Sequence, residues 1–230
     1  MHNFTGTLAP MPMYGLRKQY RKEIMRHSNN IKTAGHSLEN AKKALIMIHG
    51  RGGNATDILS MSAYLNVGDY ALLAPQADNY TWYPHSFMAP EQNNEPWLSS
   101  AIEVIENTVQ LALDKGVQTE NIYFFGFSQG ACLTLEFLAR NARRYGGAVA
   151  IIGGLIGEKI DSNKYMGDFG QTPIFIGTSD PDFHVPLERV NASVSILEAQ
   201  HANVKLAVYP NFGHSINQEE IHMANEFVFH

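Results

Sequence analysis

Residues 121–139, NIYFFGFSQGACLTLEFLA, contain the stretch that decides the fold. The run 121–125 is short and rich in β-branched and aromatic residues, which predicts a buried strand. The pentapeptide GFSQG at 126–130 follows without a gap. The segment 131–140 then carries leucines and a phenylalanine at helical spacing. The sequence therefore predicts a strand, a very sharp turn at Ser128 and a helix.

The pentapeptide has the form G-x-S-x-G, and a strand before it with a helix after it is the context of a nucleophile elbow. Glycines two residues before and after Ser128 remove the Cβ atoms that would clash where strand and helix converge. The serine hydroxyl is then expected at the helix N-terminus, where free N–H groups favour developing negative charge. The alternative is a glycine-rich turn without chemistry, so the rest of the chain has to support the interpretation.

Apolar runs alternate with helical patterns through the rest of the chain. Strands are expected over 31–34, 44–48, 70–73, 148–152, 173–176 and 204–208. Helices are expected to begin near 55–57 and to cover 97–115, 185–200 and 217–229. This alternation predicts an α/β fold with a single, mostly parallel, doubly wound sheet and helices on both faces. Such sheets carry their functional residues in loops beyond the carboxyl ends of the strands.

Length and composition bound the class of protein. With 230 residues, 44% of them apolar and 17% charged, the chain fits one globular domain over 1–230, in which 1–30 is an N-terminal edge segment of uncertain structure. A net charge of −5 argues against a nucleic-acid partner. The chain has no apolar stretch of about 18 residues and no apolar leader, so we expect a cytoplasmic protein without a membrane span. Cys132 is the single cysteine, and neither metal-ligand spacing nor a cofactor motif is present.

A serine hydroxyl needs a base to take its proton and an acid to orient that base. His214 lies in a glycine-containing loop between the last expected strand and the last helix. This position predicts the base, although one of ten histidines falling in a surface loop is not rare. The loop after 173–176 offers two acids, of which Asp182 stands four residues before Pro186 and Asp180 three residues after Gly177. We favour Asp182 as the acid and keep Asp180 as the alternative.

A tetrahedral intermediate needs N–H donors for its oxyanion. The first is expected from Gln129, which follows the nucleophile. The second is expected from the glycine-rich loop HGRGG at 49–53, through the N–H of Arg51. A glycine turn into a helix is the alternative interpretation of this loop.

The motifs HGRGG, GFSQG, an Asp/Val-Pro loop and GHS, in this order over about 31–230, resemble the phospholipase/carboxylesterase branch of the α/β-hydrolases. The resemblance implies a compact α/β-hydrolase without a large lid domain that acts on carboxylic ester or thioester substrates. That branch includes bacterial carboxylesterases and acyl-protein thioesterases. The related dienelactone hydrolases use a cysteine nucleophile, whereas this chain has Ser128.

The loop 76–96 departs from the thioesterases. Its Trp82-Tyr83-Pro84 is similar to a bacterial subgroup of poorly defined substrate, with members linked to quinone or aromatic-compound stress. This departure argues against long-chain acyl-protein substrates. Side chains expected to contact the substrate, or else to anchor loops, are Tyr80, Trp82, Tyr83, Phe87, His85 and His184.

The sequence therefore predicts a serine hydrolase that cleaves small to medium acyl or aromatic esters through an acyl-enzyme. A thioesterase or lysophospholipase is the alternative within the class, and a non-catalytic binding protein on the same scaffold is the alternative outside it. A nucleotide-binding domain is disfavoured because residues 49–54 lack the G-x-G-x-x-G spacing. An exposed edge strand or the loop 76–96 with its aromatic residues offers a surface for a homodimer.

Overall fold

A seven-stranded sheet runs through the protein, and a computed structural model describes residues 26–230. Its strands are β1 (Ile31–Gly35), β2 (Lys43–Ile48), β3 (Tyr70–Pro75), β4 (Ile122–Phe127), β5 (Gly147–Ile151), β6 (Pro173–Asp180) and β7 (Asn203–Pro210). The strand order is β1-β3-β2-β4-β5-β6-β7, and every neighbouring pair is parallel except β1 with β3. The predicted α/β-hydrolase fold with a mostly parallel sheet is confirmed.

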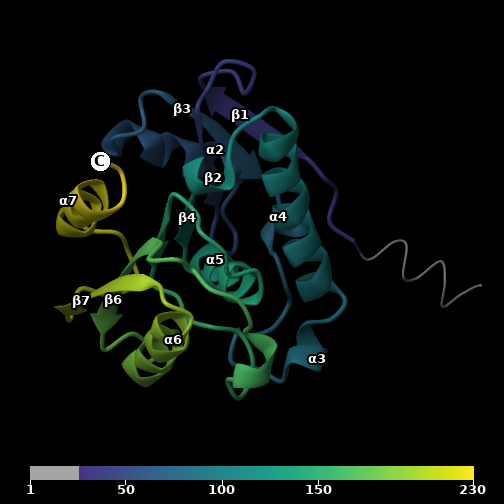
Figure 1. Cartoon of the computed structure of the whole chain (residues 1–230). Helices are drawn as coiled ribbons and strands as arrows, with labels where there is room; N and C mark the ends of the chain where they lie inside the picture. The colour runs from purple at the N-terminus through teal and green to yellow at the C-terminus, as the bar shows by residue number, and fades with distance from the viewer. Residues whose placement is uncertain (1–25) are drawn as a thin grey trace, which may run out of the picture.

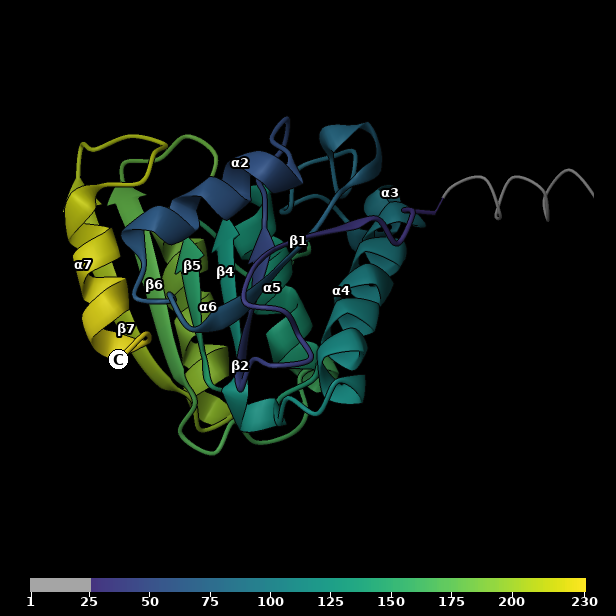
Figure 2. The ribbon, with the colours of Figure 1, turned by 90° about the horizontal axis from the view of Figure 1, so that it is seen from above.

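Helices cover both faces of the sheet (Figure 1). They are α2 (Ala55–Ser60), α3 (Glu91–Asn94), α4 (Trp97–Asp114), α5 (Gln129–Arg140), α6 (Leu187–Ala199) and α7 (Gln218–Phe227), with short 3-10 turns η1 (Met61–Tyr64), η2 (Asp78–Tyr80), η3 (Thr119–Asn121) and η4 (Ser162–Lys164). Figure 2 shows α2 and α7 on one face of the sheet and α4, α5 and α6 on the other. No helix within residues 26–230 has the length and apolar character needed to cross a membrane.

The central strands are apolar on both sides because both of their faces are covered by helices. In β2 the five residues from Ala44 to Ile48 are fully buried, and so is β5. Strand β4 is buried as far as Gly126. Helix α5 is buried along almost its whole length. This rigid centre carries the turn at Ser128, so the turn is held by the most deeply packed part of the molecule.

Some element boundaries differ from the prediction. Strand β6 continues to Asp180 instead of ending near residue 176, because it pairs with β7 as far as Asp180 opposite Pro210. The long loop 76–96 contains η2 and α3. The strand predicted over 31–34 is β1, which lies at the edge of the sheet and pairs antiparallel with β3. Residues 1–25 of the predicted N-terminal edge segment lie outside the described part of the chain.

Candidate active site

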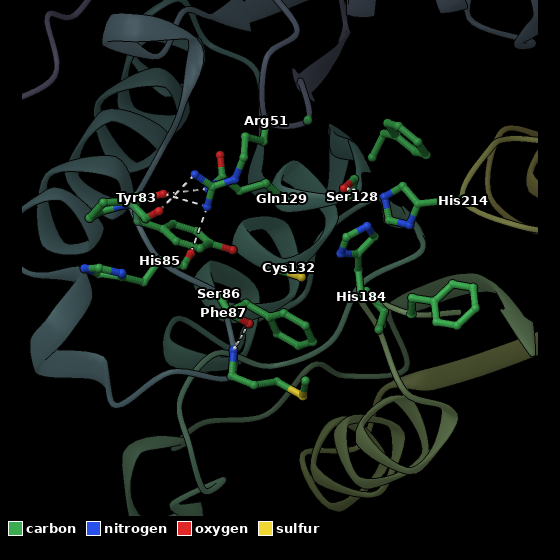
Figure 3. Close-up of a pocket in the computed structure, with 16 residues that line it drawn as sticks. Arg51, Tyr83, His85, Ser86, Phe87, Ser128, Gln129, Cys132, His184 and His214 are labelled. Atoms are coloured by element: carbon green, nitrogen blue, oxygen red, sulfur yellow. Dashed lines mark hydrogen bonds between the residues drawn. The ribbon is translucent and has the colours of Figure 1, made fainter. Parts of the chain in front are cut away.

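The loops that leave the carboxyl ends of the strands surround one open cavity of about 530 Å³ (Figure 3). The cavity collects residues from loops after β2, β3, β4, β6 and β7. Its lining includes Ser128 and His214 together with Arg51 and Gln129. Residues that are far apart in the sequence, and that were selected from their places after strands, therefore meet at one edge of the sheet.

Ser128 stands at the junction of β4 and α5 with an unusual backbone conformation. Its φ is 53° and its ψ is −118°, a backbone conformation that residues other than glycine rarely adopt. The turn is possible because Gly130 packs against the end of β2, where an added Cβ would lie 2.7 Å from the carbonyl oxygen of His49. At Gly126 an added Cβ would lie 2.5 Å from the carbonyl oxygen of Gly130. These two glycines let strand, turn and helix converge and leave the serine at the cavity.

Ser128, His214 and Asp182 form a continuous chain of hydrogen bonds. His214 Nε2 lies 2.7 Å from Ser128 Oγ, and His214 Nδ1 lies 2.8 Å from Asp182 Oδ2. The Asp182 side chain is 1% exposed, whereas that of His214 is 30% exposed. Since the carboxylate accepts at Nδ1, the imidazole carries its proton there and presents an unprotonated Nε2 to the serine hydroxyl.

Asp182 is also fixed by its own backbone turn. Its Oδ1 accepts hydrogen bonds from the N–H groups of His184 and Val185, at 2.7 Å and 2.8 Å. Burial acts to raise the pKa of this carboxyl, but the hydrogen bonds from His214 and from the two N–H groups outweigh it and hold the pKa below its ordinary value. Asp182 is therefore an ionised acceptor, ordered before any substrate binds.

Asp180, the alternative acid, occupies a different place. It is the last residue of β6, and it is exposed. Its carbonyl oxygen accepts a hydrogen bond from the backbone N–H of Asn211, and the His214 imidazole bonds to Asp182 instead of to its carboxylate. Strand pairing with β7 continues to this residue, so its side chain remains at the surface while Asp182 reaches the histidine.

The two backbone N–H groups selected as oxyanion donors belong to loops that touch each other. Gln129 is the first residue of α5, so its N–H has no acceptor inside the helix. Arg51 follows β2 in the loop where Gly50 packs against the turn, with an added Cβ 3.3 Å from the carbonyl oxygen of Phe127. Neither N–H donates to a backbone acceptor among the described loops and caps. Both residues line the cavity, and neither N–H is used by these backbone contacts, as the prediction of two oxyanion donors requires.

The predicted substrate contacts divide between cavity and core. Tyr83, His85, Phe87 and His184 line the cavity, and the His184 ring packs against the His214 ring at 5.2 Å. Further lining residues that the sequence analysis had not selected are Met88, Phe127, Phe183 and Cys132. Cys132 is a buried residue of α5, and its spacing of four from Ser128 places it on the same face of the helix.

Trp82 is a correction to the predicted substrate contacts. It is fully buried and is not part of the cavity lining. Its ring packs against His27 and His49, and its indole N–H donates to the carbonyl oxygen of His49 at 2.9 Å. Tyr80 also lies outside the lining and is 57% exposed. Trp82 therefore anchors the loop 76–96 to the core, which is the alternative that the sequence left open.

Two buried histidines hold the same loop and were missed by sequence reasoning. His49 Nε2 accepts from the N–H of Ala77, and His27 Nδ1 accepts from the N–H of Asp78. Burial lowers the pKa of both histidines, so both are neutral acceptors. Within residues 26–230, no group of three or more His, Cys, Asp or Glu side chains is arranged to hold a metal ion.

Comparison with known proteins identifies the family of the chain. The phospholipase/carboxylesterase family matches residues 29–229. The crystal structure of a phospholipase/carboxylesterase from Dyadobacter fermentans is 50% identical, with a TM-score of 0.88 over 89% of this chain and 98% of that one. A SOBER1-like probable carboxylesterase of Arabidopsis thaliana is 31% identical over 54% of this chain, which spans only 48% of that protein. Acyl-protein thioesterase 1 of Saccharomyces cerevisiae is 26% identical over 87% of this chain and 97% of its own length. The chain therefore belongs to the phospholipase/carboxylesterase family of α/β-hydrolases, a family of hydrolytic enzymes.

Proposed function

We propose that this hydrolase cleaves carboxylic esters through an acyl-enzyme formed on Ser128, with His214 as the general base and Asp182 as its acidic partner. The observation that carries the proposal is the pair of hydrogen bonds, 2.7 Å and 2.8 Å long, that joins the serine oxygen to a buried carboxylate through the imidazole. A serine hydroxyl is a weak nucleophile at neutral pH, and this arrangement supplies the base that activates it.

The reaction follows from the positions of these groups. His214 Nε2 takes the hydroxyl proton as Ser128 Oγ attacks the ester carbonyl carbon, and the carbonyl oxygen becomes an oxyanion. The N–H groups of Arg51 and Gln129 donate to that oxyanion. The imidazolium, stabilised by ionised Asp182, then gives its proton to the departing alcohol, and the C–O bond breaks. Water repeats the sequence on the acyl-enzyme, which releases the acid and restores the serine.

The cavity supports substrates with a small to medium acyl group or an aromatic group. Its volume of about 530 Å³ lies within the range of small-molecule pockets. Phe87, Met88 and Phe127 supply apolar walls. The His184 ring, which packs against the His214 ring, supplies a polar group near the serine, and His85 lines the cavity farther away. Hydrolysis of thioesters is the second candidate, because the relatives matched over nearly their full length include acyl-protein thioesterase 1 of yeast.

The test is covalent labelling with a fluorophosphonate, read by intact mass on the wild-type protein and on Ser128→Ala. We expect a single adduct on the wild type, none on the variant, and a loss of about four orders of magnitude or more in esterase activity. Matched p-nitrophenyl esters and thioesters of acetate, butyrate, octanoate and benzoate then rank acyl groups and leaving atoms. A well-folded wild type that takes no label would refute the mechanism and favour a binding protein on this scaffold.

A further inference from the structure

The side chains of Arg51 and Gln129 converge on a single backbone atom, the carbonyl oxygen of Tyr83 (Figure 3). Arg51 Nη2 donates to it at 2.9 Å, and Gln129 Nε2 donates to it at 2.9 Å. The hydroxyl of Thr81 lies 3.1 Å from the same oxygen. These are the two residues whose backbone N–H groups are proposed to hold the oxyanion.

The remaining polar atoms of the Gln129 side chain are also committed to this segment. Gln129 Oε1 accepts from the N–H of Trp82 at 2.9 Å and lies 3.2 Å from the hydroxyl of Thr81. Gln129 is 6% exposed. A buried amide whose nitrogen and oxygen both have hydrogen-bond partners is held in one orientation. The Gln129 side chain therefore fixes the position of the loop relative to α5.

The Arg51 guanidinium also binds residues 81–85 through several hydrogen bonds. Beside its bond to Tyr83, it donates to the carbonyl oxygens of Pro84 and His85 at 3.1 Å and 2.8 Å, and to the hydroxyl of Thr81 at 3.0 Å. All four acceptors are neutral, and the guanidinium pairs with no carboxylate of residues 26–230. The planar fork of arginine suits this multiple contact, which a lysine does not reproduce.

A tie between these two residues has a use, because their N–H groups lie on separate loops. Arg51 follows β2 and Gln129 follows β4, and an oxyanion hole works only when its donors lie about 2.7–3.1 Å from one oxygen position. Nothing in the strand pairing alone fixes that separation, since both residues lie beyond the ends of their strands. A shared anchor atom fixes both loops to the same point.

We propose that the Tyr83 carbonyl is the anchor that sets the spacing of the oxyanion hole, and that the side chains of Arg51 and Gln129 are positioning residues acting through it. The inference rests on the proposed function, because it assigns a purpose to the proposed donors. Each of the two residues then has two tasks: its N–H binds the oxyanion, and its side chain holds that N–H in place.

The experiment compares Arg51→Met, Gln129→Met and the double variant, all of which keep both backbone N–H groups. Arg189→Met is the matched control, because Arg189 donates to three carbonyl oxygens, those of Leu155, Gly157 and Glu158, and donates to no atom of residues 49–53 or 81–85. Its guanidinium lies 5.9 Å from the ring of Phe87, a cavity wall, so the comparison is made on kcat and not on KM. The readouts are kcat and KM for one p-nitrophenyl ester, the rate of labelling by a fluorophosphonate, and the melting temperature. The labelling rate is informative because the phosphoryl oxygen of the probe enters the oxyanion hole.

We expect kcat and the labelling rate to fall together by about 10- to 100-fold in each single variant, with KM within about threefold. The double variant is expected to lose little more than the worse single variant, since both arms hold one atom. Arg189→Met is expected to melt earlier but to keep kcat within about threefold. Arg51→Lys is expected to lose nearly as much kcat as Arg51→Met, because the fork and not the charge makes the tie.

Three results would overturn the inference. The first is kcat within about threefold of wild type in both single variants, measured well below their melting temperatures. The second is full activity in Arg51→Lys, which would assign the effect to charge. The third is an equal loss in Arg189→Met, which would assign it to general loosening. Each of these is separable from failure of the proposed function, because that failure appears as a folded wild type that takes no label, or as activity or labelling that survives in Ser128→Ala.

Discussion

Replacing Asp182 by asparagine tests the proposed acid with little disturbance of the loop around it. The asparagine oxygen can still accept from the N–H groups of His184 and Val185, which hold the turn. What changes is the atom that faces His214 Nδ1. In the wild type this atom is a carboxylate oxygen 2.8 Å away, which accepts from the ring N–H. In the variant it is an amide nitrogen, which is itself a donor and cannot accept from the ring N–H. The imidazole is then stabilised in the tautomer that carries its proton on Nε2, which cannot accept from Ser128.

The magnitude follows from the charge that is lost. An imidazolium and a carboxylate with charge centres about 4 Å apart interact by about 4 kcal/mol at an effective dielectric constant of about 20. That energy corresponds to roughly a thousandfold in rate, and the wrong tautomer adds to it. We therefore expect Asp182→Asn to lower kcat by about 10³- to 10⁴-fold with KM little changed.

The assay is initial-rate hydrolysis of a p-nitrophenyl ester at pH 7.5, on protein whose fold is checked by circular dichroism and thermal melting. Asp180→Asn is the matched control, since the exposed Asp180 engages its neighbour Asn211 through its backbone carbonyl, which the substitution keeps. We expect this control to stay within about twofold of wild type. A folded Asp182→Asn enzyme that retains a tenth of wild-type kcat, or an equal loss in Asp180→Asn, would refute the assignment of the acid.

Three further substitutions test the packing and the buried charges. Gly130→Ala puts a methyl group 2.7 Å from the His49 carbonyl oxygen, so we expect it to lower the free energy of unfolding in urea by about 3 kcal/mol or more. Gly68→Ala is its control, because an added methyl there has nothing within 4 Å, and we expect a loss of less than about 1 kcal/mol. Burial raises the pKa of Glu220 from 4.5 to about 7, so the wild-type protein loses stability as pH rises through that window. Glu220→Gln should therefore match the wild type in stability at pH 4. At pH 8 the variant should be more stable, by at most about 3 kcal/mol in chemical denaturation. Burial lowers the pKa of His27, so the native state loses stability as pH falls below about 6.5, and His27→Gln should show a flatter loss between pH 7.5 and pH 5 by thermal melting. Equal melting curves for His27→Gln and wild type at both pH values would contradict the last expectation.

Much of the fold was predictable because its signals are local. The central strands are continuous apolar runs, since helices cover both of their faces, and they were located to within about two residues. The carboxyl end of β6 was not predictable, because its last residues are held by pairing with β7 and not by their own hydrophobicity. Where a strand extends beyond its own apolar run, its length depends on the partner strand.

The site was predictable to the level of loops and not of individual contacts. The placement of Ser128 and His214 after two different strands was enough to bring them together, because parallel strands end at one edge. The aromatic residues of the loop 76–96 could not be sorted this way. Trp82 and Tyr83 are adjacent, aromatic and equally buried, yet only Tyr83 borders the cavity, and both have the same hydrophobic signal in the sequence.

The sequence by itself therefore determined the sheet, the sharp turn at Ser128 and the set of loops that meet at the cavity. These follow from periodicity, glycine placement and chain order, which are properties of neighbouring residues. Only the tertiary structure decided that Asp182 and not Asp180 reaches His214, and that Arg51 and Gln129 both grip the Tyr83 carbonyl. Contacts between separate loops depend on strand ends and packing across the sheet, to a fraction of an ångström, and no local pattern encodes such distances.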